Sequence, residues 1–395
     1  MQLVGRRYDT GEIVRVVFSG DQITSIRAVS DTNDAPWIAP GLIDIQLNGY
    51  GGQEFGAADL TIDKVTTIVR QIGSHGVSRF CPTVTTQSFD VLAHALRALD
   101  AACRESDEVA DRVLGIHLEG PYISAEDGPR GAHPREHCKP PDWDEFCRLQ
   151  DAASGRIRII TLSPEYDGSA EFITQAAKAG VVVAIGHTVA TPDQIRSAVD
   201  AGARLSTHLG NGAHGTLPRH PNYIWSQLAD DRLAASLIVD GHHLPPEVVQ
   251  SFVRAKTPER CILVSDLSGL AGLPPGRYET SLCELEILDD GCLVLAGQRQ
   301  YLAGASRPLC DGVANVMRFA GVDLATAVDM ASRRPLELLG KPVTELSPES
   351  RGDLVLFELP GTESGETLGE VRVVTTIAGG HVVYQSPTKT APEIR

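Results

Sequence analysis

Short apolar runs recur along the middle of the chain, and each is followed by a longer stretch with the apolar spacing of a helix. Eight such runs can be marked, at residues 42–47, 78–84, 113–119, 157–163, 181–187, 204–210, 235–240 and 261–266. The stretches between them carry apolar residues three and four positions apart, and several end in glycine, as helices do. Eight strands that alternate with helices predict an α/β fold, a parallel (β/α)8 TIM barrel over residues 41–345. A doubly wound open sheet shares this alternation, and strand counting leaves it open as the alternative.

The two ends of the chain follow a different pattern, in which apolar and polar residues alternate over short runs between polar turns. This holds for residues 1–40 and again for residues 346–395, where the runs are 353–359, 371–380 and 381–385. Neither end has enough apolar surface to form a core alone, so we expect both to pair into one small β-sandwich domain. Residues 278–302 are expected to form short strands inserted after the barrel, and residues 388–395 a loose tail.

Charge and composition narrow the classes of function. The 395 residues include 35 Lys and Arg against 51 Asp and Glu, which gives a net charge of −16. Such a field repels polyanions, so a partner such as nucleic acid or an anionic membrane is disfavoured, and an anionic small substrate would need a local basic pocket. Residues 1–20 lack the apolar stretch of a signal peptide, and no window approaches the ~18 apolar residues of a membrane span, so we predict a cytoplasmic protein. The eight cysteines form no CxxC pair and are expected to be small buried residues.

Several predicted strands end in polar residues that carry chemistry. His117 and Glu119 end one strand, and His187, His208 and Asp266 end three others. In a barrel of parallel strands the active site lies at the carboxyl ends of the strands, so these side chains are expected to converge.

One carboxylate and two imidazoles form a ligand set for zinc or a similar divalent ion, with a position left for water. We predict Glu119, His187 and His208 as this set. Asp266 is then placed to take the water's proton and hand it to a leaving amine, in the hydrolysis of an amide-like bond. The ordinary alternatives are packing for each histidine and helix capping for Glu119 and Asp266. His117 shares a strand face with Glu119 and is a candidate partner for it, or again a packing residue.

At this point the sequence resembles a known family. The segments HLEGP (117–121), GHT (186–188), THL (207–209) and VSD (264–266) occur in the order typical of N-acetylglucosamine-6-phosphate deacetylases of the amidohydrolase superfamily. The resemblance extends from about residue 38 to residue 384 and includes PGLIDIQLNGYGG (40–52), RGAHP (130–134), VDGHHL (239–244) and LAGAS (302–306). It implies a metal-dependent barrel with a small β-sandwich, usually a homodimer, that removes acetate from a 6-phosphorylated 2-acetamido sugar. Glu119, His187 and His208 fall on the family's metal ligands and Asp266 on its catalytic acid and base.

Two further positions bear on the number of metal ions. Many superfamily members carry an HxH pair after the first strand for a second metal, and this chain has Gln46 and Asn48 there. Because neither amide is a good zinc ligand, we predict one bound metal, with loop hydrogen bonding as the role of the two amides. Zinc is the expected ion, although iron, manganese and cobalt accept the same ligands.

The resemblance also assigns substrate contacts. It places Asn211 and the backbone of Gly212 against the sugar or phosphate, and His243 on the sugar phosphate. Arg219 falls on a phosphate ligand that reaches across a dimer interface, and an arginine suits a phosphate because its planar fork donates two hydrogen bonds. Without the family frame, Arg219 is an ordinary surface residue. His133 falls on a loop position that contacts substrate, with loop hydrogen bonding as the alternative.

The sequence departs from the family pattern at three places on the expected pocket wall. These are residues 212–213, residues 307–308, and the stretch that carries Tyr223 and Trp225, where stacking on a sugar ring competes with packing at a core or interface. Substrate identity is therefore less determined than metal-dependent hydrolysis. Two other functions stay open: an amidohydrolase for a different N-acyl or amide substrate, and a sugar-phosphate binder without catalysis.

Overall fold

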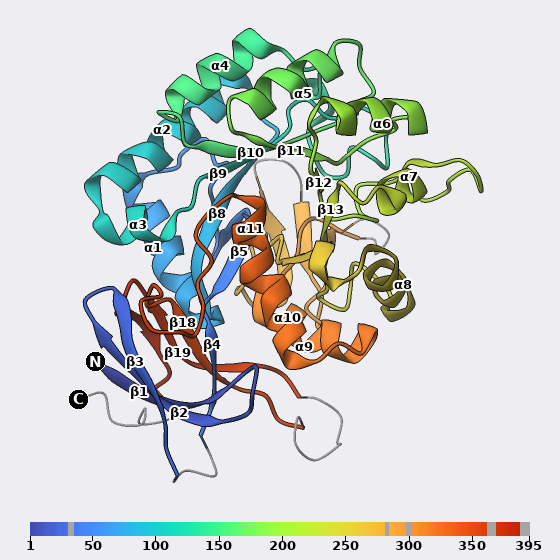
Figure 1. Cartoon of the computed structure of the whole chain (residues 1–395). Helices are drawn as coiled ribbons and strands as arrows, with labels where there is room; N and C mark the ends of the chain where they lie inside the picture. Colours follow the sequence, from blue (N-terminus) through green and yellow to red (C-terminus); the bar gives the residue numbers. More distant parts are fainter. Residues whose placement is uncertain (31–34, 281–283, 298–301, 362–368, 388–395) are drawn as a thin grey trace.

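The computed structural model describes residues 1–30, 35–280, 284–297, 302–361 and 369–387, and its centre is an eight-stranded parallel sheet. The strands are β5 (Leu42–Leu47), β8 (Val77–Thr85), β9 (Ile116–Glu119), β10 (Ile157–Leu162), β11 (Val182–Ile185), β12 (Leu205–Ser206), β13 (Ala234–Ile238) and β14 (Cys261–Val264). They are hydrogen-bonded in chain order, from β5 to β14. Figure 1 shows the sheet curling around a central axis inside a ring of helices.

The last strand meets the first, which closes the barrel. The backbone N–H of Asp266 donates to the Gln46 carbonyl at 2.9 Å, and Leu47 forms a parallel bridge with Leu267. The predicted (β/α)8 barrel is thereby confirmed, and the open doubly wound sheet is ruled out. Its interior is filled by branched and small apolar side chains, among them Ile43, Ile159 and Ile262.

The helices of the ring carry the amphipathic spacing seen in the sequence. They are α1 (Ile62–Ile72), α2 (Phe89–Glu105), α3 (Asp107–Arg112), α4 (Trp143–Ala152), α5 (Ser169–Lys178), α6 (Pro192–Ala201), α7 (Tyr223–Ala229), α8 (Pro246–Lys256), α9 (Leu309–Ala320), α10 (Leu324–Ala331) and α11 (Arg333–Leu338). Several of them begin at a capping side chain: in α6, Thr191 and Gln194 form a reciprocal capping box on either side of Pro192, the first residue of the helix. Short 3-10 helices cover Gly73–His75, Arg135–His137 and Pro258–Arg260.

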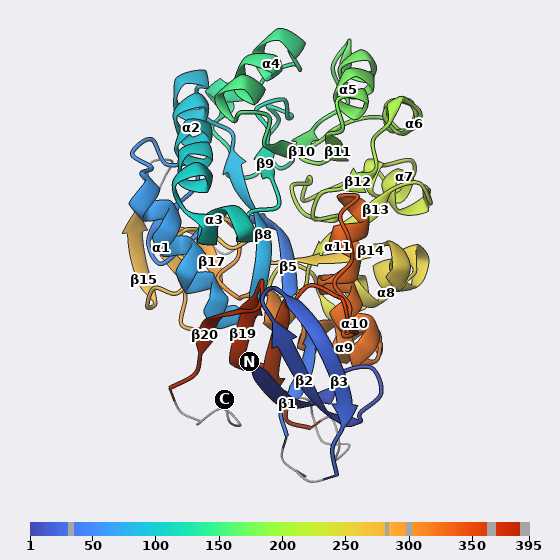
Figure 2. The ribbon, with the colours of Figure 1, turned by 60° about the vertical axis from the view of Figure 1, so that its left-hand side comes forward.

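Both chain ends build one small β domain, as predicted. Its sheet has the order β20-β19-β18-β4-β1-β2-β3. The strands are β1 (Gln2–Arg7), β2 (Ile13–Ser19), β3 (Gln22–Ala28), β4 (Trp37–Pro40), β18 (Leu354–Glu358), β19 (Arg372–Ala378) and β20 (His381–Gln385). The sheet curls around a core of its own that contains Val16, Ile38 and Leu356. In Figures 1 and 2 the dark-blue and red strands lie side by side below the barrel.

Two smaller sheets accompany the barrel. The pair β6 (Gly49–Tyr50) and β7 (Gln53–Glu54) follows β5, and an antiparallel insert consists of β15 (Gly276–Glu279), β16 (Glu284–Ile287) and β17 (Leu293–Leu295). The insert matches the strands expected at residues 278–302, while the tail expected at 388–395 and Cys283 lie outside the described residues. Of the seven described cysteines, Cys138 and Cys147 are partly exposed and the other five are buried.

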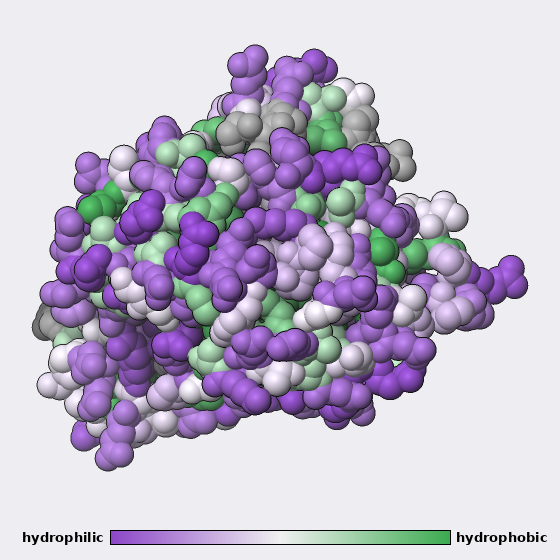
Figure 3. Space-filling view, turned by 90° about the horizontal axis from the view of Figure 1, so that it is seen from above, coloured by the Kyte–Doolittle hydropathy of each residue, from purple (hydrophilic) through white to green (hydrophobic). Residues whose placement is uncertain are grey.

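The molecular surface agrees with the acidic, polar composition. The face seen in Figure 3 is mainly hydrophilic, with hydrophobic residues scattered between hydrophilic ones. Trp225, on α7, is the largest exposed hydrophobic side chain among the described residues, at 51% exposure. No helix in the described ranges has the length and apolar character needed to cross a membrane.

Candidate active site

The predicted site residues converge at the carboxyl ends of the barrel strands. Glu119 is the last residue of β9. His187 lies two residues beyond the end of β11, His208 two beyond β12, and Asp266 two beyond β14. These three have positive φ angles of 50°, 29° and 52°. A non-glycine residue rarely adopts this left-handed conformation, and where it occurs it is often held for function. It also explains why the sixth predicted strand, 204–210, stops at Ser206: the backbone must turn to aim His208 inward.

Glu119, His187 and His208 bring three ligand atoms into a small triangle. Glu119 Oε1 lies 3.2 Å from His187 Nε2 and 3.1 Å from His208 Nε2, and the two Nε2 atoms are 3.1 Å apart. All three side chains are buried. Ligand atoms around a tetrahedral zinc, with bonds of about 2.0–2.1 Å, lie roughly 3.3 Å apart, so the triangle has the size of a metal site. His187 Nδ1 lies 2.8 Å from the Pro129 carbonyl and must donate to it, which turns the Nε2 lone pair toward the centre.

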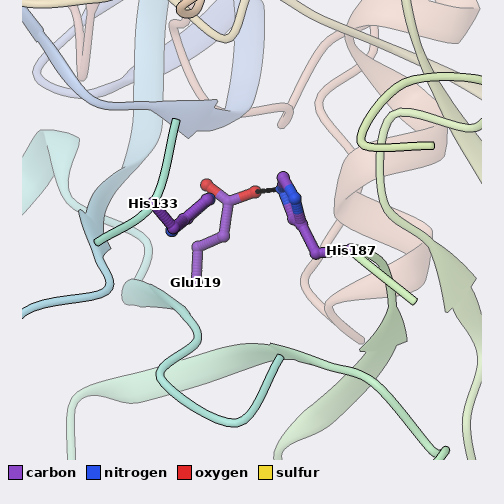
Figure 4. A group of neighbouring side chains, drawn as sticks. All are labelled: Glu119, His133 and His187. Carbon is purple, nitrogen blue, oxygen red and sulfur yellow. Dashed lines mark hydrogen bonds and ion pairs between the residues drawn. The ribbon is translucent and has the colours of Figure 1, made fainter. Parts of the chain in front are cut away.

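His133 lies next to this triangle. Together with Glu119 and His187 it forms a group whose ligand atoms are all within 4.8 Å of one another, drawn in Figure 4. Its Nδ1 is 2.9 Å from Thr86 Oγ1, and its ring meets the His187 ring edge-on at 4.4 Å between centroids. The spacing of 3.1–3.2 Å in the triangle with His208 is the tighter of the two ligand sets. His133 thus lies in contact with the candidate metal centre and at the cavity wall.

Two amides donate to Asp266, and one of them, Gln46, also reaches Glu119. Asn48 Nδ2 donates to Asp266 Oδ1 at 2.8 Å, and Gln46 Nε2 lies 3.0 Å from Glu119 Oε1 and 3.3 Å from Asp266 Oδ1. Both amides thus form the hydrogen bonds expected of them, Asn48 from the loop after β5 and Gln46 from within β5 itself. Both amides direct N–H groups at carboxylates, an orientation that offers donors rather than ligands.

The pKa values of the two carboxylates are shifted in opposite directions. Burial raises the pKa of Asp266, and the nearby charge of Glu119 raises it further. Burial also opposes the charged form of Glu119, but hydrogen bonds and charge from His187 and His208 outweigh it and hold that pKa well below its usual range. Two neighbouring acids with pKa values pushed apart are typical of acid and base pairs in enzymes.

His117 is engaged with the neighbouring strands rather than with Glu119. Its Nδ1 lies 3.0 Å from the Ile45 carbonyl and its Nε2 2.7 Å from Thr161 Oγ1, so both ring nitrogens are occupied. Burial lowers the pKa of His117 to about 4, which keeps the ring neutral. It packs the barrel beneath the site.

A cavity of about 380 Å³ opens above these residues. Of the predicted substrate contacts, Asn211, Gly212, His243 and His133 all line it. His243 Nδ1 is paired with Asp240 Oδ2 at 2.7 Å, which leaves its Nε2 as the polar atom available to a ligand. Arg219 does not line the cavity; it is an exposed residue in the segment before α7, which projects from the barrel in Figure 1. The described residues of the wall include no lysine or arginine.

Sequence reasoning missed several residues of the wall and its support. Glu54 on β7 lines the cavity, as does Thr280 from the insert. Glu54 follows the GYGG turn after the first barrel strand, so its position on the chain was a usable signal. The supporting contacts of Thr86 with His133 and of Pro129 with His187 join distant loops, and no periodicity marks them.

No protein-family model matches the chain, but known proteins are similar to it over most of its length. The N-acetylglucosamine-6-phosphate deacetylase of Homo sapiens is 34% identical over 361 residues, which cover 88% of this chain and 84% of the relative. The N-acetylgalactosamine-6-phosphate deacetylase of Escherichia coli O157:H7 is 32% identical, covering 82% and 84%.

Among solved structures, a mutant N-acetyl-D-glucosamine-6-phosphate deacetylase from Mycobacterium smegmatis, in complex with N-acetyl-D-glucosamine-6-phosphate, superposes with a TM-score of 0.84. It is 28% identical, and the match covers 97% of this chain and 99% of that one. By sequence and by fold, the chain belongs to the N-acetylglucosamine-6-phosphate deacetylase family.

Proposed function

We propose that this protein is a metal-dependent deacetylase that converts N-acetylglucosamine 6-phosphate to glucosamine 6-phosphate and acetate. The observation that carries the proposal is the buried triangle of Glu119, His187 and His208, whose ligand atoms lie 3.1–3.2 Å apart. The buried carboxylate of Asp266 lies beside it, and both line a cavity large enough for a sugar. Family membership supplies the substrate class. A divalent ion at the triangle, when bound, lowers the pKa of water and polarises the acetamide carbonyl.

In this proposal the chain's own residues bind, orient and move protons. The side chain of Asp266 takes a proton from the attacking water and returns it to the amine as the C–N bond breaks. Its raised pKa suits both steps, because the carboxyl group must gain and lose a proton in one cycle. Asn48 and Gln46 hold Asp266 Oδ1 by N–H donors, which leaves Oδ2 for the transfer.

One metal ion is proposed, held by Glu119, His187 and His208. Two imidazole nitrogens and a carboxylate oxygen fit zinc and equally fit iron, manganese or cobalt; zinc is proposed as the resident ion. The amides at the position of a second site act as hydrogen-bond donors to the carboxylates.

His133, His243, Asn211 and the backbone of Gly212 are proposed to bind the sugar and its phosphate. The described cavity wall is without lysine or arginine, and a phosphate bound there needs a cation. We therefore also propose a homodimer in which the exposed Arg219 of one copy completes the phosphate site of the other.

A second substrate has a specific observation in its favour. Two of the relatives, from Escherichia coli O157:H7 at 32% identity and from Shewanella at 28%, are N-acetylgalactosamine-6-phosphate deacetylases. The galactosamine epimer is thus a second candidate for the same chemistry.

An assay of acetate release tests both candidate substrates. The purified protein, supplied with zinc, is assayed with N-acetylglucosamine 6-phosphate, its galactosamine epimer and unphosphorylated N-acetylglucosamine. We expect the highest kcat/KM for the first. Preference for the epimer would reassign the sugar, and activity on none of the three would redirect the site to other N-acyl compounds. Tight binding of the phosphosugars without acetate release would support the non-catalytic binder.

A further inference from the structure

Two loops that wall the cavity hold the ring of His187 between them. Loop 124–134 provides the Pro129 carbonyl, 2.8 Å from His187 Nδ1. It also places the backbone of Gly131 beside the ring: a Cβ there would lie 3.4 Å from His187 Cε1. Loop 208–215 brings Gly212 closer still, since a Cβ on Gly212, at φ +55°, would lie 2.7 Å from His187 Nδ1. The orientation of this candidate metal ligand therefore depends on both loops.

His214 joins the two loops. Its Nε2 lies 3.3 Å from Glu126 Oε2 in loop 124–134, and its Nδ1 lies 3.1 Å from the hydroxyl of Tyr223. The backbone N–H of His214 donates to the same hydroxyl at 2.9 Å. The hydroxyl can thus accept from the backbone and donate to Nδ1, which leaves the Nε2 proton for Glu126. The loop backbones also meet directly, because a Cβ on Gly128 would lie 3.1 Å from His214 Cα.

Tyr223 is a firm anchor for this arrangement. It is the first residue of α7, is only 6% exposed, and packs against the main core of the barrel. Asn222 caps the helix by accepting from two of its backbone N–H groups. Glu126, in contrast, is 63% exposed, so its pairing with His214 contributes little by itself.

We propose that Tyr223, with His214 and Glu126, forms a clasp that positions His187 and so sets how tightly the metal is retained. Tyr223 and His214 hold loop 208–215 against one side of the His187 ring, and Glu126 ties loop 124–134 to the same unit. The proposal rests on the proposed function only in taking Glu119, His187 and His208 as the metal site; the identity of the sugar does not enter. These are positioning residues, since they act through His187.

The test compares metal affinity in single variants. Tyr223→Phe removes one hydroxyl, and with it both hydrogen bonds to His214. The zinc dissociation constant is measured by competition with a fluorescent chelator, and the melting temperature of the metal-free protein is recorded alongside. Changing groups that orient a metal ligand typically costs 10- to 100-fold in affinity. Because Tyr223 acts one step further away, we expect a loss of about three- to tenfold. Glu126→Gln should lose less than twofold.

Tyr122→Phe is the matched control. It also removes a hydroxyl from a buried tyrosine, here one that bonds the Asp142 carbonyl and Glu145 near α4, away from the clasp. Its zinc affinity should stay within twofold of wild type. If Tyr223→Phe folds poorly, His214→Ala takes its place, because the His214 side chain is 30% exposed and its removal disturbs the core less. We expect the same three- to tenfold loss of zinc affinity.

Wild-type zinc affinity in the folded Tyr223→Phe or His214→Ala variant would overturn the clasp, as would an equal loss in Tyr122→Phe. Failure of the proposed function looks different. A protein that binds zinc but releases no acetate from any of the sugars, while Tyr223→Phe still binds zinc more weakly, loses the deacetylase assignment and keeps the clasp.

Discussion

Asp44 gives the sharpest test of the electrostatics inside the barrel. It lies on β5, is fully buried, and accepts backbone N–H bonds at Oδ1 from Gln46 at 3.2 Å and Ser265 at 3.3 Å. The bond from Ser265 ties β5 to the segment after β14, where the barrel closes. Within the described part of the chain Oδ2 has no hydrogen-bond partner. Burial raises the pKa of Asp44 to about 7, from an ordinary value of 3.8.

The sign and size of the effect follow from linkage. The folded state binds this proton more tightly than the unfolded state, so the stability that the raised pKa confers is present at low pH. It is lost as pH rises from about 4 to about 7, and little changes above that. One pKa unit corresponds to about 1.36 kcal/mol. Between pH 5 and pH 8 the single group should therefore cost the wild-type protein about 2–3 kcal/mol of unfolding free energy.

Asp44→Asn removes the titration and keeps an acceptor for the two N–H groups. Urea unfolding of both proteins at pH 5 and pH 8, with the same saturating zinc, isolates the effect, because the metal-site groups titrate alike in both. The new amide N–H is itself unpaired, so the variant has a constant penalty. Its stability relative to wild type should nevertheless rise by about 2–3 kcal/mol from pH 5 to pH 8. A relative stability that changes by less than about 0.5 kcal/mol would refute a neutral, buried Asp44.

Three further predictions concern the site. Asp266→Asn should keep its metal, measured by elemental analysis, and lose about 10²- to 10⁴-fold in kcat; wild-type turnover would remove Asp266 from proton transfer. Arg219→Ala should raise KM for the phosphorylated sugar far more than for the unphosphorylated one in acetate-release assays, and equal losses would exclude a phosphate contact. His208→Ala should reduce bound metal below one equivalent after dialysis, whereas His133→Ala should keep one equivalent and raise KM. The reverse result would make His133 the third ligand in place of His208.

Much of the site could be predicted from sequence because a parallel barrel converts position along the chain into position in space. Glu119, His187, His208 and Asp266 each end a recognisable apolar run, and the carboxyl ends of all eight runs meet on one rim. The barrel and the paired chain ends were predictable for a second reason. Each is built from strands and helices whose apolar residues recur with a short, fixed period along the chain.

The remaining features depend on contacts that no period encodes. Glu126 and His214 are 88 residues apart and meet only because two irregular loops cross above the barrel. The prediction that Tyr223 either stacks on sugar or packs in a core left out its hydroxyl, which holds His214. For His117 the periodic pattern was present but insufficient. Strand alternation placed it on the same face as Glu119, yet groups on the adjacent strands, the Ile45 carbonyl and the Thr161 hydroxyl, engage both of its ring nitrogens.

The amides of Gln46 and Asn48 connect the number of metals with the behaviour of Asp266. Two carboxylates in one buried site repel each other, and a second cation between them would relieve that repulsion and hold Asp266 ionised. Neutral N–H donors relieve it only in part, so the pKa of Asp266 stays raised. With amides in place of metal ligands at Gln46 and Asn48, we expect Asp266 to stay available for the proton uptake that the proposed mechanism requires. If the site holds one metal ion, as proposed, its function depends on how firmly that ion is held, and we expect the loops that orient His187 to contribute to this.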